Sequence, residues 1–252
     1  MKKSILNKIK LRILGIILFI VLWQILSMII GENTFIFPGP IESFKQAIAM
    51  LKESYIYKCI YETMYRMCVG FLISFVLAFV LGVIAGNNNK IEELIKPTMT
   101  ILRSVPTATL VYLFLVIAGA RLTPLFIVIL VAFPILYESI LGGIKSTPKV
   151  LLEAGMLDGA SVIQTNTKIR IPLSIPYIAV GFASSFALSL KIEIMAEVIT
   201  GYTRLGLGSA ILSAQRSDPT NMVPVFAYSL VAIVIMLIFD EIASMIKNKY
   251  SS

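Results

Sequence analysis

The feature that most constrains this chain is a series of long apolar runs that recurs along its whole length. A helix needs about 20 mostly apolar residues to cross the roughly 30 Å hydrocarbon core of a bilayer. Hydrophobic residues make up 58% of the chain and charged residues 14%, whereas about 25% of a typical soluble domain is charged. The composition therefore predicts an all-α integral membrane protein, with one transmembrane domain over residues 1–252.

About six membrane-spanning helices can be placed on these runs by length and composition. The first follows a basic N-terminus, as in a signal peptide. Its apolar core is longer than usual and no small-x-small cleavage site follows it, so we expect it to be retained. The predicted spans are residues 11–30, 61–85, 102–118, 123–144, 173–199 and 223–244.

The basic residues behind the net charge of +8 collect at the N-terminus and in alternate loops between the spans. This distribution is typical of membrane topology and argues against a surface that binds nucleic acid. An even number of spans places both termini on one side. The segments on that side, including a loop at residues 145–172, hold 14 of the 22 basic residues, and the opposite loops hold six. Because loops rich in Lys and Arg stay in the cytoplasm, both termini and this loop are predicted to be cytoplasmic.

The segment between the first two spans contains the turn Phe37-Pro38-Gly39-Pro40, followed by a stretch with helical periodicity. Two interpretations of this stretch stay open: an interfacial helix on the outer leaflet, or a loop helix packed on the spans. The positions that share its apolar face are Ile41, Phe44, Ala47, Ile48 and Leu51.

The loop at residues 145–172 carries signals for two short helices. Thr147-Pro148 fits an N-cap followed by proline at the first helical position. Gly159 can end the first helix in a left-handed cap. Ser161, with Gln164 three residues later, has the capping-box pattern that starts a second helix. These signals alone would also fit an ordinary amphipathic helix that covers the ends of the spans.

The spacing of residues within this loop is more specific than its helical signals. Glu153 is followed by two small residues, by Gly159 six positions later, by Ile169 sixteen positions later and by Pro172 nineteen positions later. This spacing resembles the cytoplasmic "EAA" loop of permease subunits in bacterial ATP-binding-cassette (ABC) importers, through which ATP hydrolysis is coupled to transport. Two departures are visible, because Gly155 stands where the motif usually has its second Ala and Ile171 replaces the usual Leu. The matching residues, which the resemblance identifies as the coupling residues, are Glu153, Ala154, Gly155, Gly159, Ile169 and Pro172.

Other segments resemble the permease subfamily that handles sulfonates, taurine, nitrate and similar small solutes. They are Arg103-Ser104-Val105-Pro106-Thr107, Phe133-Pro134-Ile135 and Gly206-Leu207-Gly208. Tyr112 stands where that subfamily often has a proline. The resemblance implies a type I ABC importer permease fold with a cytoplasmic coupling helix, in the bacterial inner membrane.

The resemblance also implies partners: two cytoplasmic ATPase subunits, a second permease copy (most simply an identical one), an external solute-binding protein and membrane lipid. The sequence contains no Gly-x-x-x-x-Gly-Lys-Ser/Thr motif, so ATP and Mg²⁺ are expected in the partner ATPase and no catalysis is expected here. With no His and two Cys, no cofactor or metal centre is expected in this chain.

Ionisable residues within the fifth span are the candidates for the solute pathway or a gate. Glu193 and Glu197 share a helix face, while Lys191 points elsewhere. Ionisable groups at membrane depth usually face a bundle interior or water, so Glu193, Met195 and Glu197 are candidate pathway residues. Alternatively, the charged groups lie at the outer interface, with the acids paired to polar loop groups.

Competing functional hypotheses are a self-contained secondary transporter or channel, the membrane component of a vitamin-type importer with a different coupling loop, and a membrane enzyme. No convincing internal repeat favours the first. No cluster of catalytic residues favours the last. For an importer permease, the subfamily resemblance implies that the solute is a small organic or inorganic anion or a related metabolite. Permeases of this type leave solute recognition to the binding protein, so the spans themselves do not identify the solute.

Overall fold

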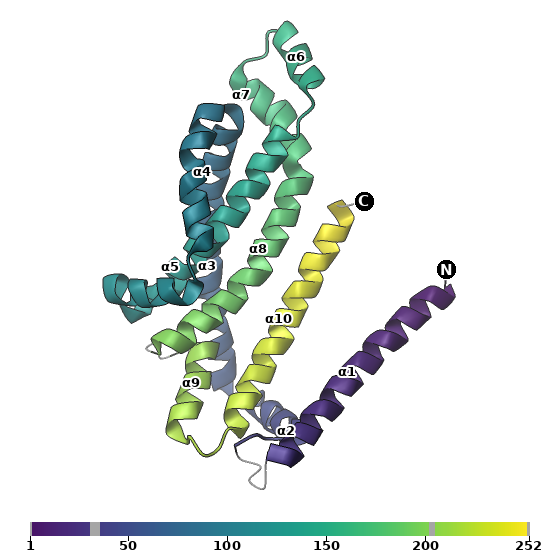
Figure 1. The fold of residues 1–252 in the computed structure, drawn as a ribbon, viewed down its shortest axis with the longest axis vertical. Coiled ribbons are helices and arrows are strands. Elements are labelled where there is room, and N and C mark those ends of the chain that lie inside the picture. The colour runs from purple at the N-terminus through teal and green to yellow at the C-terminus, as the bar shows by residue number, and fades with distance from the viewer. Residues whose placement is uncertain (1, 31–35, 202–204, 251–252) are drawn as a thin grey trace. The chain divides into compact units, whose positions relative to one another are not determined.

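The computed structural model describes residues 2–30, 36–201 and 205–250, and all regular structure within these ranges is helical. The all-α fold class is therefore confirmed. The elements in Figure 1 are α1 (Lys2–Ile30), α2 (Pro40–Met50), α3 (Ser54–Asn87), α4 (Asn89–Ser104), α5 (Thr107–Lys145), α6 (Lys149–Leu157), α7 (Val162–Thr165), the π-helix η1 (Asn166–Arg170), α8 (Ile171–Thr200), α9 (Leu207–Ser217) and α10 (Val223–Tyr250).

Within the residues that the structure describes, four helical segments are long and apolar enough to cross a membrane: α3, α5, Val162–Thr200 and α10. Helix α1 contains a shorter apolar stretch, Leu14–Ile30. Two of the predicted spans, the third and the fourth, both fall largely in α5. The number of crossings, predicted as six, stays a prediction.

The predicted third span, 102–118, begins five residues before helix α5. Leu102 belongs to the end of α4, and α5 begins at Thr107. Between them Val105 is extended, with φ −74° and ψ 126°. The cause is local, because the ring of Pro106 disfavours the helical conformation at the preceding residue.

Helix α5 contains one residue with non-helical torsions, Gly119, with φ 72° and ψ 164°. A residue with a side chain would be strained there. The predicted third and fourth spans, 102–118 and 123–144, therefore meet at a kink of one glycine within α5.

The chain divides into two compact units, residues up to 58 with 210–233, and residues 59–209 with the C-terminal segment from 234. In the first unit the turn before α2 is fixed to α1. Trp23 Nε1 donates to the carbonyl of Pro38 at 3.1 Å, and Ser27 Oγ donates to that of Phe37 at 2.8 Å. The Trp23 ring also stacks on Phe226, with centroids 5.9 Å apart.

Helix α2 begins at Pro40, directly after this turn. Of the predicted apolar face, Ala47 is buried, whereas Ile41, Phe44, Ile48 and Leu51 are exposed. Helix α2 nevertheless buries Pro40, Ser43, Ala47 and Met50, and the Phe44 ring lies near the Trp23 ring of α1, with centroids 6.4 Å apart. Most of the predicted apolar face is exposed while another side of the helix is packed, so both interpretations of this stretch stay open.

In the second unit, small residues bring α3, α5 and α8 close together, as is common between membrane helices. A Cβ on Gly82 of α3 would lie 2.8 Å from Ile140 Cγ2 of α5, and a Cβ on Gly143 of α5 would lie 2.7 Å from Ser174 Cβ of α8. The Phe71 ring of α3 packs nearly perpendicular to the rings of Phe182 and Phe186 of α8, with centroids 4.8 and 5.0 Å away.

Candidate functional site

The loop at residues 145–172 forms the short helix α6, a glycine corner, and the helices α7 and η1, which lead directly into α8. Gly159 has φ 74°, as predicted for a left-handed cap. The N–H of Ala160 donates to the carbonyl of Gly155 at 2.9 Å, which is the bond of a Schellman cap. The end of helix α6 is therefore fixed by a backbone hydrogen bond and by the left-handed conformation of Gly159.

The predicted start of the second helix is confirmed. The Ser161 hydroxyl accepts from the Gln164 N–H at 3.3 Å, and the Gln164 side chain accepts from the Ser161 N–H at 2.9 Å. The predicted start of the first helix is wrong. Thr147 donates its hydroxyl hydrogen to the carbonyl of Ile144, at 3.0 Å, and α6 begins at Lys149.

Two of the predicted coupling residues are in contact, although they are far apart in the sequence. Gly155 is buried, and a Cβ built on it would lie 3.2 Å from Ile169 Cδ1. The presence of Gly where the motif usually has Ala therefore gives the Ile169 side chain room to pack against α6. Glu153, Ala154, Gly159 and Pro172 are exposed.

Helices α6 and α7 present apolar side chains to the outside of the chain. Leu157 is 89% exposed, and Val150 is 73% exposed. Such a group on a loop with fixed helix ends is typical of a surface that binds another protein. The exposed large apolar residues of the two helices are Val150, Leu151, Leu157, Val162 and Ile163.

The loop is attached to the end of α3 by two hydrogen bonds that sequence analysis did not predict. Asn87 Nδ2 donates to Asn166 Oδ1 at 2.9 Å, and Arg170 NH1 donates to the carbonyl of Gly86 at 3.0 Å. The only sequence signal was the polar turn Asn87-Asn88-Asn89. A movement of η1 would therefore be transmitted both to α8, which continues from it, and to α3.

A second cluster of polar residues lies deeper in the same unit, between α3 and α8. Arg66 forms ion pairs with Glu193, through Nε at 3.2 Å, and with Glu197, through NH2. Both glutamates are completely buried, whereas Arg66 is 14% exposed. The prediction that Glu193 and Glu197 share a face is thus confirmed.

Glu197 also fixes the segment that follows α8. It accepts from the Gly208 N–H at 2.8 Å and from Thr63 Oγ1 at 2.9 Å. The same Thr63 hydroxyl accepts from the Leu207 N–H at 2.8 Å. Sequence analysis placed Arg66 inside the second span without assigning it a partner, and it did not single out Thr63.

The remaining candidates of the fifth span lie apart from this cluster. Met195 is partly buried. Lys191 points elsewhere, as predicted, and pairs with Asp240 of α10 at 3.0 Å. Glu193 and Glu197 are enclosed by the chain in this structure. Their role in a solute pathway or gate stays a prediction.

Comparison with known proteins agrees with this geometry. The family model described as "Binding-protein-dependent transport system inner membrane component" matches residues 78–252. The riboflavin transport system permease protein RibX of Chloroflexus aurantiacus is 27% identical over 149 residues, which are 58% of this chain and 54% of RibX. A probable ABC transporter permease of Brucella melitensis is 25% identical over 220 residues, which are 87% of this chain and 86% of that protein.

A putative aliphatic sulfonates transport permease, SsuC of Bacillus subtilis, is 24% identical over 168 residues, which are 66% of this chain and 59% of SsuC. This relative is consistent with the subfamily resemblance. The match spans only about half the length of RibX and less than two thirds of SsuC.

Among solved structures, an inward-facing form of the MetNI methionine ABC transporter contains a chain that superposes with a TM-score of 0.64 at 16% identity. The match covers 78% of this chain and 96% of that chain. At this identity the likeness shows the fold alone, which is that of a type I ABC transporter permease. The family match covers well over half of the chain. The chain therefore belongs to the family of inner membrane components of binding-protein-dependent transport systems, as a transmembrane permease subunit of an ABC transporter.

Proposed function

We propose that this permease forms the solute pathway of an importer and is coupled to a separate cytoplasmic ATPase through residues 145–172. The observation that carries this proposal is the group of exposed apolar side chains on α6 and α7. The end of α6 is capped at Gly159 and the start of α7 is capped by Ser161, so the loop holds this group in a fixed position. Exposed Glu153 adds a charge beside this group that can pair with a basic residue of the ATPase.

The connections of the loop favour a mechanical role. Helix η1 runs without a break into α8, and Arg170 and Asn166 are bonded to the end of α3. A push on α6 would reach Ile169 through the contact with Gly155. Displacement of α6 by the ATPase would therefore move the cytoplasmic ends of two helices together.

The proposed assembly contains two ATPase subunits, a second copy of this permease and an external solute-binding protein, in a bacterial inner membrane with both termini in the cytoplasm. ATP and Mg²⁺ would be bound by the ATPase, since this sequence has no phosphate-binding Gly-rich motif. For the solute we propose a small organic or inorganic anion or a related metabolite. A ligand screen on the cognate binding protein tests the solute class.

The coupling proposal is tested at Gly159, where the backbone has φ 74°. Among the described residues, no surrounding atom lies within 4 Å of the position that a Cβ would take. Gly159→Val and Gly159→Asn both add a side chain to open space. Asn tolerates the left-handed conformation and Val does not. In proteoliposomes that contain the permease, its ATPase and its binding protein, the Val variant should lose stimulated ATP hydrolysis and uptake, and the Asn variant should keep both.

Membrane insertion and purification yield should be the same for the two Gly159 variants, because the glycine is exposed. Normal transport by Gly159→Val would refute the coupling role of the corner. Loss of transport in both variants would show that any side chain at this position blocks docking, which is a steric effect unrelated to backbone conformation.

A further inference from the structure

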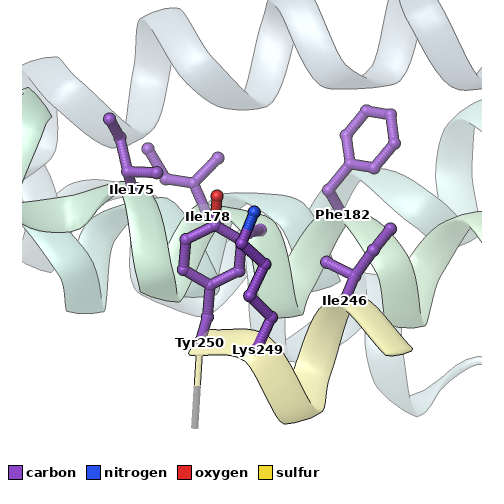
Figure 2. Close-up of a pocket in the computed structure, with 7 residues that line it drawn as sticks. Ile175, Ile178, Phe182, Ile246, Lys249 and Tyr250 are labelled. Carbon is purple, nitrogen blue, oxygen red and sulfur yellow. The ribbon is translucent and has the colours of Figure 1, made fainter. Parts of the chain in front are cut away.

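An apolar groove lies between the first turns of α8 and the last turns of α10, both in the second unit (Figure 2). Its volume is about 420 Å³. The α8 side is formed by Ile175, Ile178 and Phe182, and the α10 side by Ile246, Lys249 and Tyr250. Deeper along the two helices the groove is closed where Phe186 stacks on Phe239, with centroids 5.2 Å apart.

The polar groups of the groove are confined to one end. Figure 2 shows Lys249 and Tyr250 rising from α10 toward the isoleucines of α8. Lys249 Nζ lies 5.6 Å from the centre of the Tyr250 ring. Tyr and Lys are the residues that occupy the level of lipid headgroups at the ends of membrane helices. The other lining side chains are apolar.

The charges around this end are positive. Lys168 and Arg170 directly precede α8, and Lys247 lies in the last turn of α10. Among the residues that the structure describes, none of those lining the groove is acidic. On α10 the nearest acidic residue in sequence, Glu241, precedes Lys249 by eight positions, about 12 Å along the helix axis.

We propose that this groove binds one anionic glycerophospholipid of the surrounding bilayer. The phosphate is held by Lys249, with the Tyr250 hydroxyl as a further donor, and an acyl chain lies along Ile175, Ile178 and Phe182. Charge complementarity selects this occupant, because a hydrophobic segment of a protein partner would leave the ammonium group without an anion. Basic pockets between membrane helices favour anionic headgroups for the same reason.

Lipid binding here is independent of the coupling role, since the groove contains none of the residues proposed to contact the ATPase. A bound lipid would join the start of α8 to the end of α10. These segments are otherwise separated by the groove at this end.

The test uses the full-length permease in nanodiscs that contain a trace of phospholipid with a photoreactive diazirine on one acyl chain. The probe is either phosphatidylglycerol or phosphatidylcholine with the same acyl chains. Mass spectrometry then quantifies adducts on the peptides that contain Ile175–Phe182 and Ile246. We expect several-fold more labelling of these peptides by phosphatidylglycerol than by phosphatidylcholine.

Two variants carry the same change of charge in the same helix end. Lys249→Ala should reduce labelling by phosphatidylglycerol to the level of phosphatidylcholine. Lys247→Ala, whose side chain does not line the groove, should leave the preference intact. Equal labelling by both lipids, or an equal loss in both variants, would overturn the proposal. Absence of adducts from the groove peptides while other membrane-facing peptides are labelled would also overturn it, because another protein surface would then cover the groove.

Discussion

Gly155 of α6 lies directly against Ile169 of η1, so that a Cβ at position 155 would be 3.2 Å from the Ile169 Cδ1 atom. Both residues belong to the motif on which the coupling proposal rests, and the contact closes α6 onto the helix that continues into α8. The absence of a large side chain at position 155 allows this close approach. The φ of Gly155 is not positive, in contrast to that of Gly159.

We expect Gly155→Ala to be tolerated, because a shift of a few tenths of an ångström at a flexible methyl end is enough to accept one Cβ. Gly155→Leu should displace Ile169 and reduce ATP hydrolysis stimulated by the binding protein, since overpacking costs about 1–3 kcal/mol. The double variant with Ile169→Ala should recover part of the activity. Full stimulation in the Leu variant would show that this contact does not order the loop.

Removal of one partner of the buried ion pair between Arg66 and Glu197 should strongly destabilise the protein. Glu197→Ala leaves the Arg66 guanidinium without its closest carboxylate and leaves the Gly208 N–H without an acceptor. Loss of one partner of a buried pair costs about 3–5 kcal/mol. The midpoint of thermal unfolding in detergent should fall clearly.

Glu62→Ala is the matched control for this prediction. Glu62 pairs with the same Arg66, at 3.4 Å and one helical turn away, but its side chain is 37% exposed. Exposed pairs of this kind contribute about 0.3–0.5 kcal/mol. Similar unfolding midpoints for Glu62→Ala and Glu197→Ala would contradict the assignment of Glu197 as the main anchor of Arg66.

Gly142 and Gly143 are adjacent in α5 but have opposite surroundings. A Cβ on Gly143 would lie 2.7 Å from Ser174 Cβ and 3.0 Å from Tyr177 Cβ. In the part of the chain that the structure describes, no surrounding atom lies within 4 Å of a Cβ on Gly142. Gly143→Ala should therefore force α8 away from α5 and lower the unfolding midpoint. Gly142→Ala should be neutral or stabilising by up to about 1 kcal/mol. Equal midpoints would show that α5 and α8 can separate without cost.

Much of the fold follows from information that is local in the sequence. The runs that contain α3 and α10 are long and apolar, and their helical character depends on length and composition alone. The junction of α4 with α5 was missed because the apolar character continues from Leu102 across the turn at Pro106. The kink at Gly119 falls between the predicted third and fourth spans, but its torsion was not predicted, since glycine permits this torsion and the sequence does not require it.

The same distinction applies to the site. The cap at Gly159 and the capping box at Ser161 involve residues only a few positions apart, so their patterns predicted them correctly. The partners of Arg66 lie 127 and 131 positions away. Helical periodicity places Glu193 and Glu197 on one face but does not identify which helix that face meets. The bonds from α3 to the coupling loop were missed for this reason too.

Membrane topology is the final prediction, and it rests on the distribution of basic residues, 14 of which lie on the side of the termini and six in the opposite loops. In a background with Cys59→Ala and Cys68→Ala, single cysteines are placed at Lys10 in α1, at Lys52 between α2 and α3, and at Lys247 in α10. Lys10 and Lys52 are exposed, and none of these positions contributes to the buried ion pairs.

In intact cells a membrane-impermeant maleimide should label only the cysteine at position 52, and after permeabilisation it should label all three. Labelling at position 10 or 247 in intact cells would place that terminus outside, which would also place the coupling loop on the wrong side for a cytoplasmic ATPase.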